Sequence, residues 1–266
     1  MSTKLRAVTR YLIKEQFQLL GWTYLCLFAA FVILPFLMAL FTGNLKGFSF
    51  ISTVSDLGLG VVFGFFIFMT MSLTYEHFKL LIQNGISRKT FWQARILTLL
   101  VMSVAGEFIA ALYNYGVTAP VHHHSASQFL DASTYSLYAH YFGSNLAINL
   151  GASFIFSCLF FIGLGTTGMA LGSIFSLLTK FVRRIVIITI PILGFFFLVF
   201  VTSTAAGNSH YNFEGLANFV KFLLGYQANG AAGNFNPWPP MLTMVIGSII
   251  MAGIAYAFNR KLRIKQ

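Results

Sequence analysis

Six long apolar runs, separated by short polar segments, constrain this chain more than any other feature of its sequence. About 20 apolar residues in a helix cross the hydrocarbon core of a bilayer, because a helix satisfies its own backbone hydrogen bonds where no water is present. The pattern therefore predicts an all-α integral membrane protein with six transmembrane helices. We place these helices at Leu20–Thr42, Leu57–Leu73, Ile96–Val117, Leu146–Leu178, Ile185–Thr202 and Met241–Phe258.

The composition also indicates a nonaqueous solvent. Apolar types make up 57% of the 266 residues and charged types only 9%, whereas soluble domains contain about 25% charged residues. The net charge of +11 does not indicate nucleic-acid binding, because the basic residues lie in short clusters between the apolar runs. No internal repeat or soluble domain is visible, so we expect a single membrane domain over residues 1–266.

The distribution of lysine and arginine predicts which ends of the spans face the cytoplasm. Basic residues concentrate in the cytoplasmic loops of membrane proteins. Here 15 of the 17 lie in the N-terminal stretch, in the loops after the second and fourth runs, and in the C-terminal tail. Only Lys46 and Lys221 lie elsewhere. An even number of spans separates the four basic segments, which places them all on one side and predicts that both termini are cytoplasmic.

Two segments outside the runs are predicted to lie at the membrane surface. Residues 1–19 are basic and moderately amphipathic, which favours an interfacial helix that turns into the first span; a solvated basic tail is the alternative. Residues 203–240 precede the sixth run on the outer side. Their apolar residues recur at helical spacing, Gly225 could end that helix, and the following prolines force an irregular approach to the span. An interfacial loop without a transport role is equally compatible with this pattern.

Residues 74–95, between the second and third runs, form the most informative polar segment. Tyr75–Gln83 can continue as a helix. Asn84 and Gly85 tolerate the left-handed conformation that stops a helix, and Ser87 is a suitable N-cap for a new helix that begins at Arg88. The sequence therefore predicts a helix, a sharp corner and a second helix that project into the cytoplasm. An ordinary polar loop is the alternative.

The segment Gln83–Trp92, Gln-Asn-Gly-Ile-Ser-Arg-Lys-Thr-Phe-Trp, resembles the Asn-Gly-[Ile/Val]-Ser-Arg-Lys-x-Phe segment of bacterial ABC-2 type transporter permeases. The order of the other elements is similar to that family in outline, although only about ten residues carry the motif. The resemblance implies a permease subunit in the bacterial cytoplasmic membrane, which exports a hydrophobic or amphipathic substrate such as a lipid, peptide or drug. It also implies a second permease subunit, in a homodimer or a heterodimer.

The resemblance further implies a cytoplasmic coupling corner that docks on a separate ATPase. ATP and Mg would be bound by that partner, because this chain has no G-x-x-x-x-G-K-[ST] phosphate loop. We therefore expect no catalytic residue and no cofactor in this chain. The residues implied in the docking contact are Glu76, His77, Lys79, Asn84, Gly85, Ser87, Arg88 and Lys89.

Glu107 is the one acidic residue well inside an apolar run. An intramembrane carboxylate is energetically costly, and it indicates either a transport pathway or a buried structural partner. With Tyr113 and Asn114 on the same span, it is a candidate for lining or gating a substrate pathway. Two other functions remain open: a proton-coupled secondary transporter that uses Glu107, and a sensor or immunity protein that transports nothing.

The remaining motifs predict structure rather than chemistry. Gly168 and Gly172 form a G-x-x-x-G pair, which lets helices approach closely in lipid, within the chain or at a dimer interface. The histidines at 122–124 are adjacent on a predicted outer loop, where a polar segment is more plausible than a metal site. We expect Asp56 to cap the second span.

Overall fold

The computed structural model describes residues 2–132, 135–139, 141–205, 214–228 and 235–262. Of these described residues, 83% are helical. Within the described residues the extended pairing is limited to one isolated bridge between Tyr226 and Phe235. The α-helices are α1 (Thr3–Phe28), α2 (Leu34–Phe41), α3 (Phe50–Ser55), α4 (Leu59–Ser72), α5 (Thr74–Gln83), α6 (Arg88–Tyr113), α7 (Ala119–Val121), α8 (Ala126–Ala132), α9 (Leu146–Leu177), α10 (Lys180–Ala205), α11 (Glu214–Leu223) and α12 (Trp238–Asn259).

Four helical stretches in the described part of the chain are long and apolar enough to cross a membrane: Thr3–Phe41, Arg88–Val121, Leu146–Leu177 and Trp238–Asn259. A fifth is obtained if α4 and the end of α5, which are bent by 45° at their junction, count as one broken span. The 26-residue helix α10 contains the predicted fifth run. The all-α class and several long apolar helices are thus present, and they are compatible with a membrane-embedded protein.

Large apolar side chains cover much of the outside of these helices. Phe65 on α4 is 70% exposed, and Ile249 on α12 is 67% exposed. Soluble monomers rarely present extended apolar surface to water, because its hydration is unfavourable. The exposed residues are therefore compatible with an apolar surrounding solvent.

The N-terminal segment does not have the turn that we expected before the first span. α1 runs without interruption from Thr3 to Phe28, through the predicted boundary at Leu19 and Leu20. No proline or capping residue interrupts the helix there, and Gly21 is tolerated within it. The separate interfacial helix over residues 1–19 is therefore not present as a distinct element.

Two of the long helices contain a π-helical turn shortly before a proline. The turn Ala29–Ile33 precedes Pro35, and the turn Asn114–Thr118 precedes Pro120. A proline inside a helix removes one backbone donor and clashes with the preceding turn. A π turn widens the helix by one residue, which lets both helices continue past the proline.

The core lies where α4, α6 and α9 cross, with α1 and α12 on its flanks. Phe63, Ile67 and Met71 of α4 are completely buried against α6 and α9. Gly106 of α6 leaves the space that the Phe63 ring occupies, since a methyl group at Gly106 would overlap that ring. The Phe63 ring of α4 thus fills a position where α6 has no side chain.

The predicted G-x-x-x-G pair makes a close helix contact inside this chain. A methyl group at Gly168 would overlap the carbonyl oxygen of Phe68, and one at Gly172 would overlap that of Ser72. Both of these carbonyl groups belong to the backbone of α4. The pair therefore brings α9 directly onto the end of α4.

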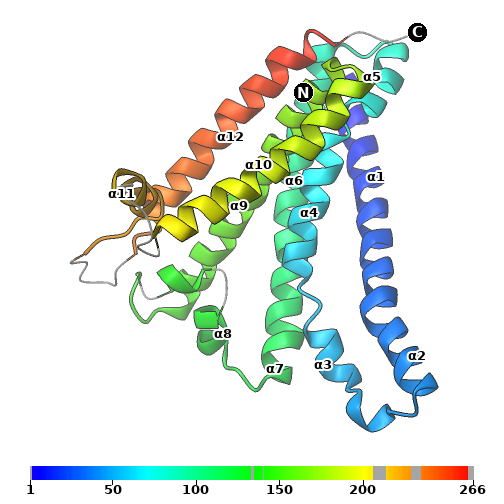
Figure 1. Ribbon diagram of the computed structural model, residues 1–266. Helices are drawn as coiled ribbons and strands as arrows, with labels where there is room; N and C mark the ends of the chain where they lie inside the picture. Colours follow the sequence, from blue (N-terminus) through cyan, green and yellow to red (C-terminus); the bar gives the residue numbers. More distant parts are fainter. Residues whose placement is uncertain (1, 133–134, 140, 206–213, 229–234, 263–266) are drawn as a thin grey trace.

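Figure 1 shows the corner between α5 and α6 at the same end of the molecule as the start of α1 and the end of α12. α2, α3 and α7 lie at the opposite end, towards which the helices diverge (Figure 1). This arrangement puts the predicted coupling corner beside both ends of the described chain.

Candidate functional site

The corner between α5 and α6 has the local structure that its sequence predicts. α5 ends at Gln83, and Gly85 takes a left-handed conformation with φ of +73°. The Ser87 hydroxyl accepts a hydrogen bond of 3.1 Å from the backbone N–H of Thr90, and α6 begins at Arg88. A helix stop and an N-cap only three residues apart fix the direction of the chain sharply.

The inner face of the corner is apolar and buried. Phe78 of α5 and Phe91 of α6 pack edge to face, with ring centroids 5.8 Å apart, and both side chains are at most 1% exposed. Val8 and Leu12 of α1 and Leu262 after α12 belong to the same cluster. Both ends of the described chain therefore hold the corner in place.

Arg95 of α6 fixes the junction between α4 and α5. The residue is 4% exposed, and its guanidinium donates to the Met71 carbonyl oxygen and, over 2.6 Å, to the Thr74 hydroxyl. The last carbonyl groups of a helix lack partners within that helix, and Arg95 supplies one to the end of α4. No ion pair with a carboxylate is formed by this arginine among the described residues. Arg95 thus acts as an internal brace at the bend.

Arg88 is directed to the end of α12. Its guanidinium donates to the Arg260 carbonyl oxygen, and the Asn259 side-chain amide donates back to the Arg88 carbonyl oxygen over 3.4 Å. A cation at a helix C-terminus is favourable, because the unpaired carbonyl groups there carry partial negative charge. Arg88 therefore ties the start of α6 to the end of α12.

The residues implied in docking divide into two groups. His77 faces α1, where its Nε2 lies 3.1 Å from Glu15 Oε2, and Arg88 contacts Arg260. Lys79 and Lys89 lie on the exposed surface of the corner, together with Asn84, Gly85 and Ser87. The side chain of Glu76 lies outside the part that the structure describes. The corner thus presents a lysine-containing outer face.

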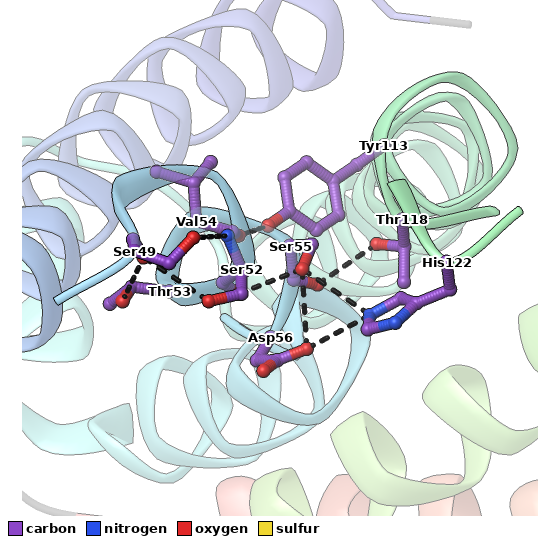
Figure 2. Close-up of polar contacts among 9 residues, drawn as sticks. All are labelled: Ser49, Ser52, Thr53, Val54, Ser55, Asp56, Tyr113, Thr118 and His122. Atoms are coloured by element: carbon purple, nitrogen blue, oxygen red, sulfur yellow. Dashed lines mark hydrogen bonds and ion pairs between the residues drawn. The ribbon is translucent and has the colours of Figure 1, made fainter. Parts of the chain in front are cut away.

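A second polar cluster lies at the opposite end, between α3 and the end of the third span. His122 Nε2 is 3.2 Å from Asp56 Oδ1 and 3.3 Å from the Ser55 hydroxyl. The Thr118 hydroxyl donates to the Ser55 carbonyl oxygen over 3.0 Å, and the Tyr113 hydroxyl donates to that of Val54. Figure 2 shows Tyr113, Thr118 and His122 reaching one short segment of α3.

This cluster corrects the prediction for Asp56. The N-cap of α4 is Gly58, in a left-handed conformation and without a side-chain hydrogen bond, whereas Asp56 caps the C-terminus of α3. Two residues separate Asp56 from the start of α4, so its carboxylate turns to His122 instead. Among the described residues no group of three or more histidine, cysteine or acidic side chains could hold a metal ion.

The residues proposed for a substrate pathway do not converge. Glu107 is partly buried on α6. Tyr113 binds the α3 segment, and Asn114 begins the π turn. Tyr113 therefore links the end of α6 to α3, away from Glu107 within that helix.

The predicted segment 203–240 is described in part. α11 ends before Gly225, whose φ is +72°, as the sequence predicts. The Gly225 carbonyl oxygen accepts from the Asn236 N–H over 2.8 Å, and the Tyr138 hydroxyl donates to the Leu224 carbonyl oxygen over 3.0 Å. Residues 206–213 and 229–234 of this segment lie outside the described residues, and they include Phe213, an apolar residue at the predicted helical spacing.

Sequence reasoning missed Arg95 and the pairing of His122 with Asp56. Arg95 was treated as one of several topology-setting cations, although its position four residues after Phe91 on the corner-facing side of α6 was a usable signal. The pair His122–Asp56 joins residues that are far apart in sequence, and no periodicity connects them.

Known proteins give no further guide. No family model, curated protein or solved structure matches this chain.

Proposed function

We propose that this chain is the transmembrane permease subunit of an ABC-2 type exporter in a bacterial cytoplasmic membrane, with six spans and both termini in the cytoplasm. The resemblance of the segment Gln83–Trp92 suggests the class. One observation carries the proposal further: the α5–α6 corner is anchored on its inner face and exposed on its outer face.

The anchoring makes the corner suitable for transmitting force. Phe78 and Phe91 are buried, and Arg95 joins α6 to the end of α4. Packed protein interiors deform little, so a displacement at the corner moves the helices attached to it. A partner that pushes on the corner would therefore move the second and third spans together.

The contacts narrow the residues proposed for docking. Arg88 already contacts Arg260, and His77 already faces Glu15. We assign the contact with the ATPase to the exposed face that contains Lys79, Asn84 and Lys89. The two lysines would meet acidic groups on the partner, because opposite charges steer association and fix register.

In this mechanism the chain performs no chemical step. The partner ATPase binds ATP and Mg and closes, the corner follows, and the paired permease subunits change the pathway between them. The apolar outer surface of the spans is consistent with a hydrophobic or amphipathic substrate that reaches the pathway from the bilayer. The second permease subunit is either another copy or a related chain.

Co-purification tests the proposal. The wild-type chain, tagged and extracted from its own host, should bring an ATP-binding subunit with it. The double variant Lys79→Glu, Lys89→Glu should lose that subunit, because both charges on the docking face are reversed. The matched control is Arg183→Glu, Arg184→Glu, which makes the same charge change at exposed residues near the start of α10. Retention of the ATPase by a folded Lys79/Lys89 variant would refute the docking face, and its absence from the wild type would refute the function.

A further inference from the structure

A cavity of about 470 Å³ lies between α3, the start of α4 and the long N-terminal helix. Its size falls within the range of small-molecule sites, about 300–1,000 Å³. Leu27, Phe31 and Val61 form an apolar part of its wall, and Ser52, Thr53 and Asp56 form a polar part. The predicted transport roles use none of these residues.

The polar part of the cavity offers acceptors. The Thr53 hydroxyl donates its proton to the Ser49 carbonyl oxygen over 2.7 Å, and the Ser52 hydroxyl donates to the same oxygen over 3.2 Å. A hydroxyl has a single proton, so both oxygens face a ligand only as acceptors. An ionised carboxylate such as Asp56 likewise only accepts. The ligand group that complements these atoms is a cation with several N–H donors.

The carboxylate of Asp56 is held in position from the other side. Ser55 and His122 both contact its Oδ1, at 3.3 Å and 3.2 Å (Figure 2). The other oxygen, Oδ2, remains to accept from a ligand. Because His122 already orients the carboxylate, less rotational freedom is lost when a cation binds.

The apolar part of the cavity opens towards the surroundings of the helices. Phe31 is 59% exposed and Val61 is 64% exposed. If the surrounding solvent is the bilayer interior, a hydrocarbon chain can pass between this wall and the lipid without exposing apolar surface to water. The polar and apolar parts together match an amphiphile with a charged head and one chain.

We propose that the cavity binds a single-chain amphiphile with a protonated primary amine. Its ammonium group donates to Asp56, Ser52 and Thr53, and its alkyl chain lies along Leu27, Phe31 and Val61. An anionic head is excluded by the charge of Asp56, and a quaternary ammonium lacks the N–H donors that the three acceptors require. Binding is a property of this chain alone, so the proposal does not depend on the exporter function or on an ATPase.

Direct binding of tritiated dodecylamine tests the proposal, with the full chain in phosphatidylcholine nanodiscs. This lipid has no N–H donor in its head group, so the bilayer does not compete for the acceptors. We expect saturable binding of dodecylamine. Dodecyltrimethylammonium should compete with an affinity about fivefold lower, which is the upper end of the effect of a partly exposed charged contact. Ethylamine, which has the head without the chain, should not compete.

Two variants and one control locate the site. Asp56→Asn keeps an oxygen for His122 but removes the charge, and it should weaken dodecylamine binding about fivefold. Val61→Trp should weaken it by filling the apolar wall. Phe65→Trp is the control, because Phe65 lies on the same helix, is 70% exposed and is not part of the cavity wall. A single symmetric peak in size-exclusion chromatography establishes that each variant is folded.

Three results would overturn the proposal. The first is equal affinity for dodecylamine and dodecyltrimethylammonium, and the second is unchanged binding in folded Asp56→Asn protein. The third is complete displacement of dodecylamine when phosphatidylethanolamine is added to the nanodiscs, which would identify a two-chain membrane lipid as the occupant. None of these results bears on co-purification with an ATPase, so the two proposals can fail separately.

Discussion

Replacing Gly172 by alanine should separate α9 from α4. A methyl group at this position would lie 2.7 Å from the Ser72 carbonyl carbon and 2.8 Å from its Cα, whereas ordinary contacts lie at 3.4–4 Å. The atoms in the way belong to the backbone of a packed helix, so no side chain can rotate aside. The Ser72 carbonyl oxygen would lie closer to the methyl group than either of these atoms, so the two helices must move apart to admit it.

The cost of this overlap can be estimated. Overpacking a core costs about 1–3 kcal/mol, and a clash with backbone places the cost near the upper value. The better helix propensity of alanine returns about 1 kcal/mol. A net loss of about 2 kcal/mol lowers the thermal midpoint of a chain of this size by about 4–8 °C.

Thermal unfolding of the purified protein in detergent, followed by intrinsic fluorescence, measures this effect. The matched control is Gly151→Ala in the same helix, where a methyl group would meet nothing within 4 Å. The control should unfold at the wild-type temperature or above it. If Gly172→Ala is as stable as Gly151→Ala, α9 does not pack on α4 through this glycine, and the pair must serve another contact.

Three further outcomes are expected. Ser87→Ala removes the cap of α6 and should cost about 1 kcal/mol, with faster hydrogen exchange at residues 88–90 that Ser87→Asn restores. Thr74→Val deprives the buried Arg95 of an acceptor and should lower the free energy of unfolding by about 1–3 kcal/mol, measured by thermal unfolding. The control is Thr70→Val, which should cost less, because the Thr70 hydroxyl donates to carbonyl oxygens of its own helix. Burial raises the pKa of Tyr135 to about 12. The unfolded chain therefore loses this proton at a lower pH than the folded chain does. The free energy of unfolding should hold below pH 10 and fall as the pH rises from 10 towards 12. Tyr135→Phe should reduce that fall, and an unchanged pH profile would contradict the assignment.

Features determined by neighbours in sequence were predictable. The run Leu57–Leu73 corresponds to α4 at Leu59–Ser72, and the run Leu146–Leu178 corresponds to α9 at Leu146–Leu177. The Asn84-Gly85 stop and the Ser87 cap also follow from local backbone preferences. Elements of this kind can be read from sequence because their determinants lie within a few residues.

Features that need a distant partner were not predictable. Asp56 was expected to cap the second span, but His122, far along the chain, determines where its carboxylate points. The expected turn at residue 19 is absent because the amphipathic stretch continues as one helix with the first apolar run. The role of Arg95 depends on Met71 and Thr74 on other elements. Sequence reasoning located the corner but not the contacts that hold it.

The π turns before Pro35 and Pro120 affect how the outer ends of two helices can be altered. One residue corresponds to about 100° of rotation around a helix axis. If Ala29–Ile33 or Asn114–Thr118 wound as a regular α-helix at unchanged length, everything beyond it would turn by about that angle. Tyr113 would keep its direction, since it precedes the second turn, whereas His122 would swing away from Asp56. The winding of these two short stretches therefore decides which face each outer helix end presents.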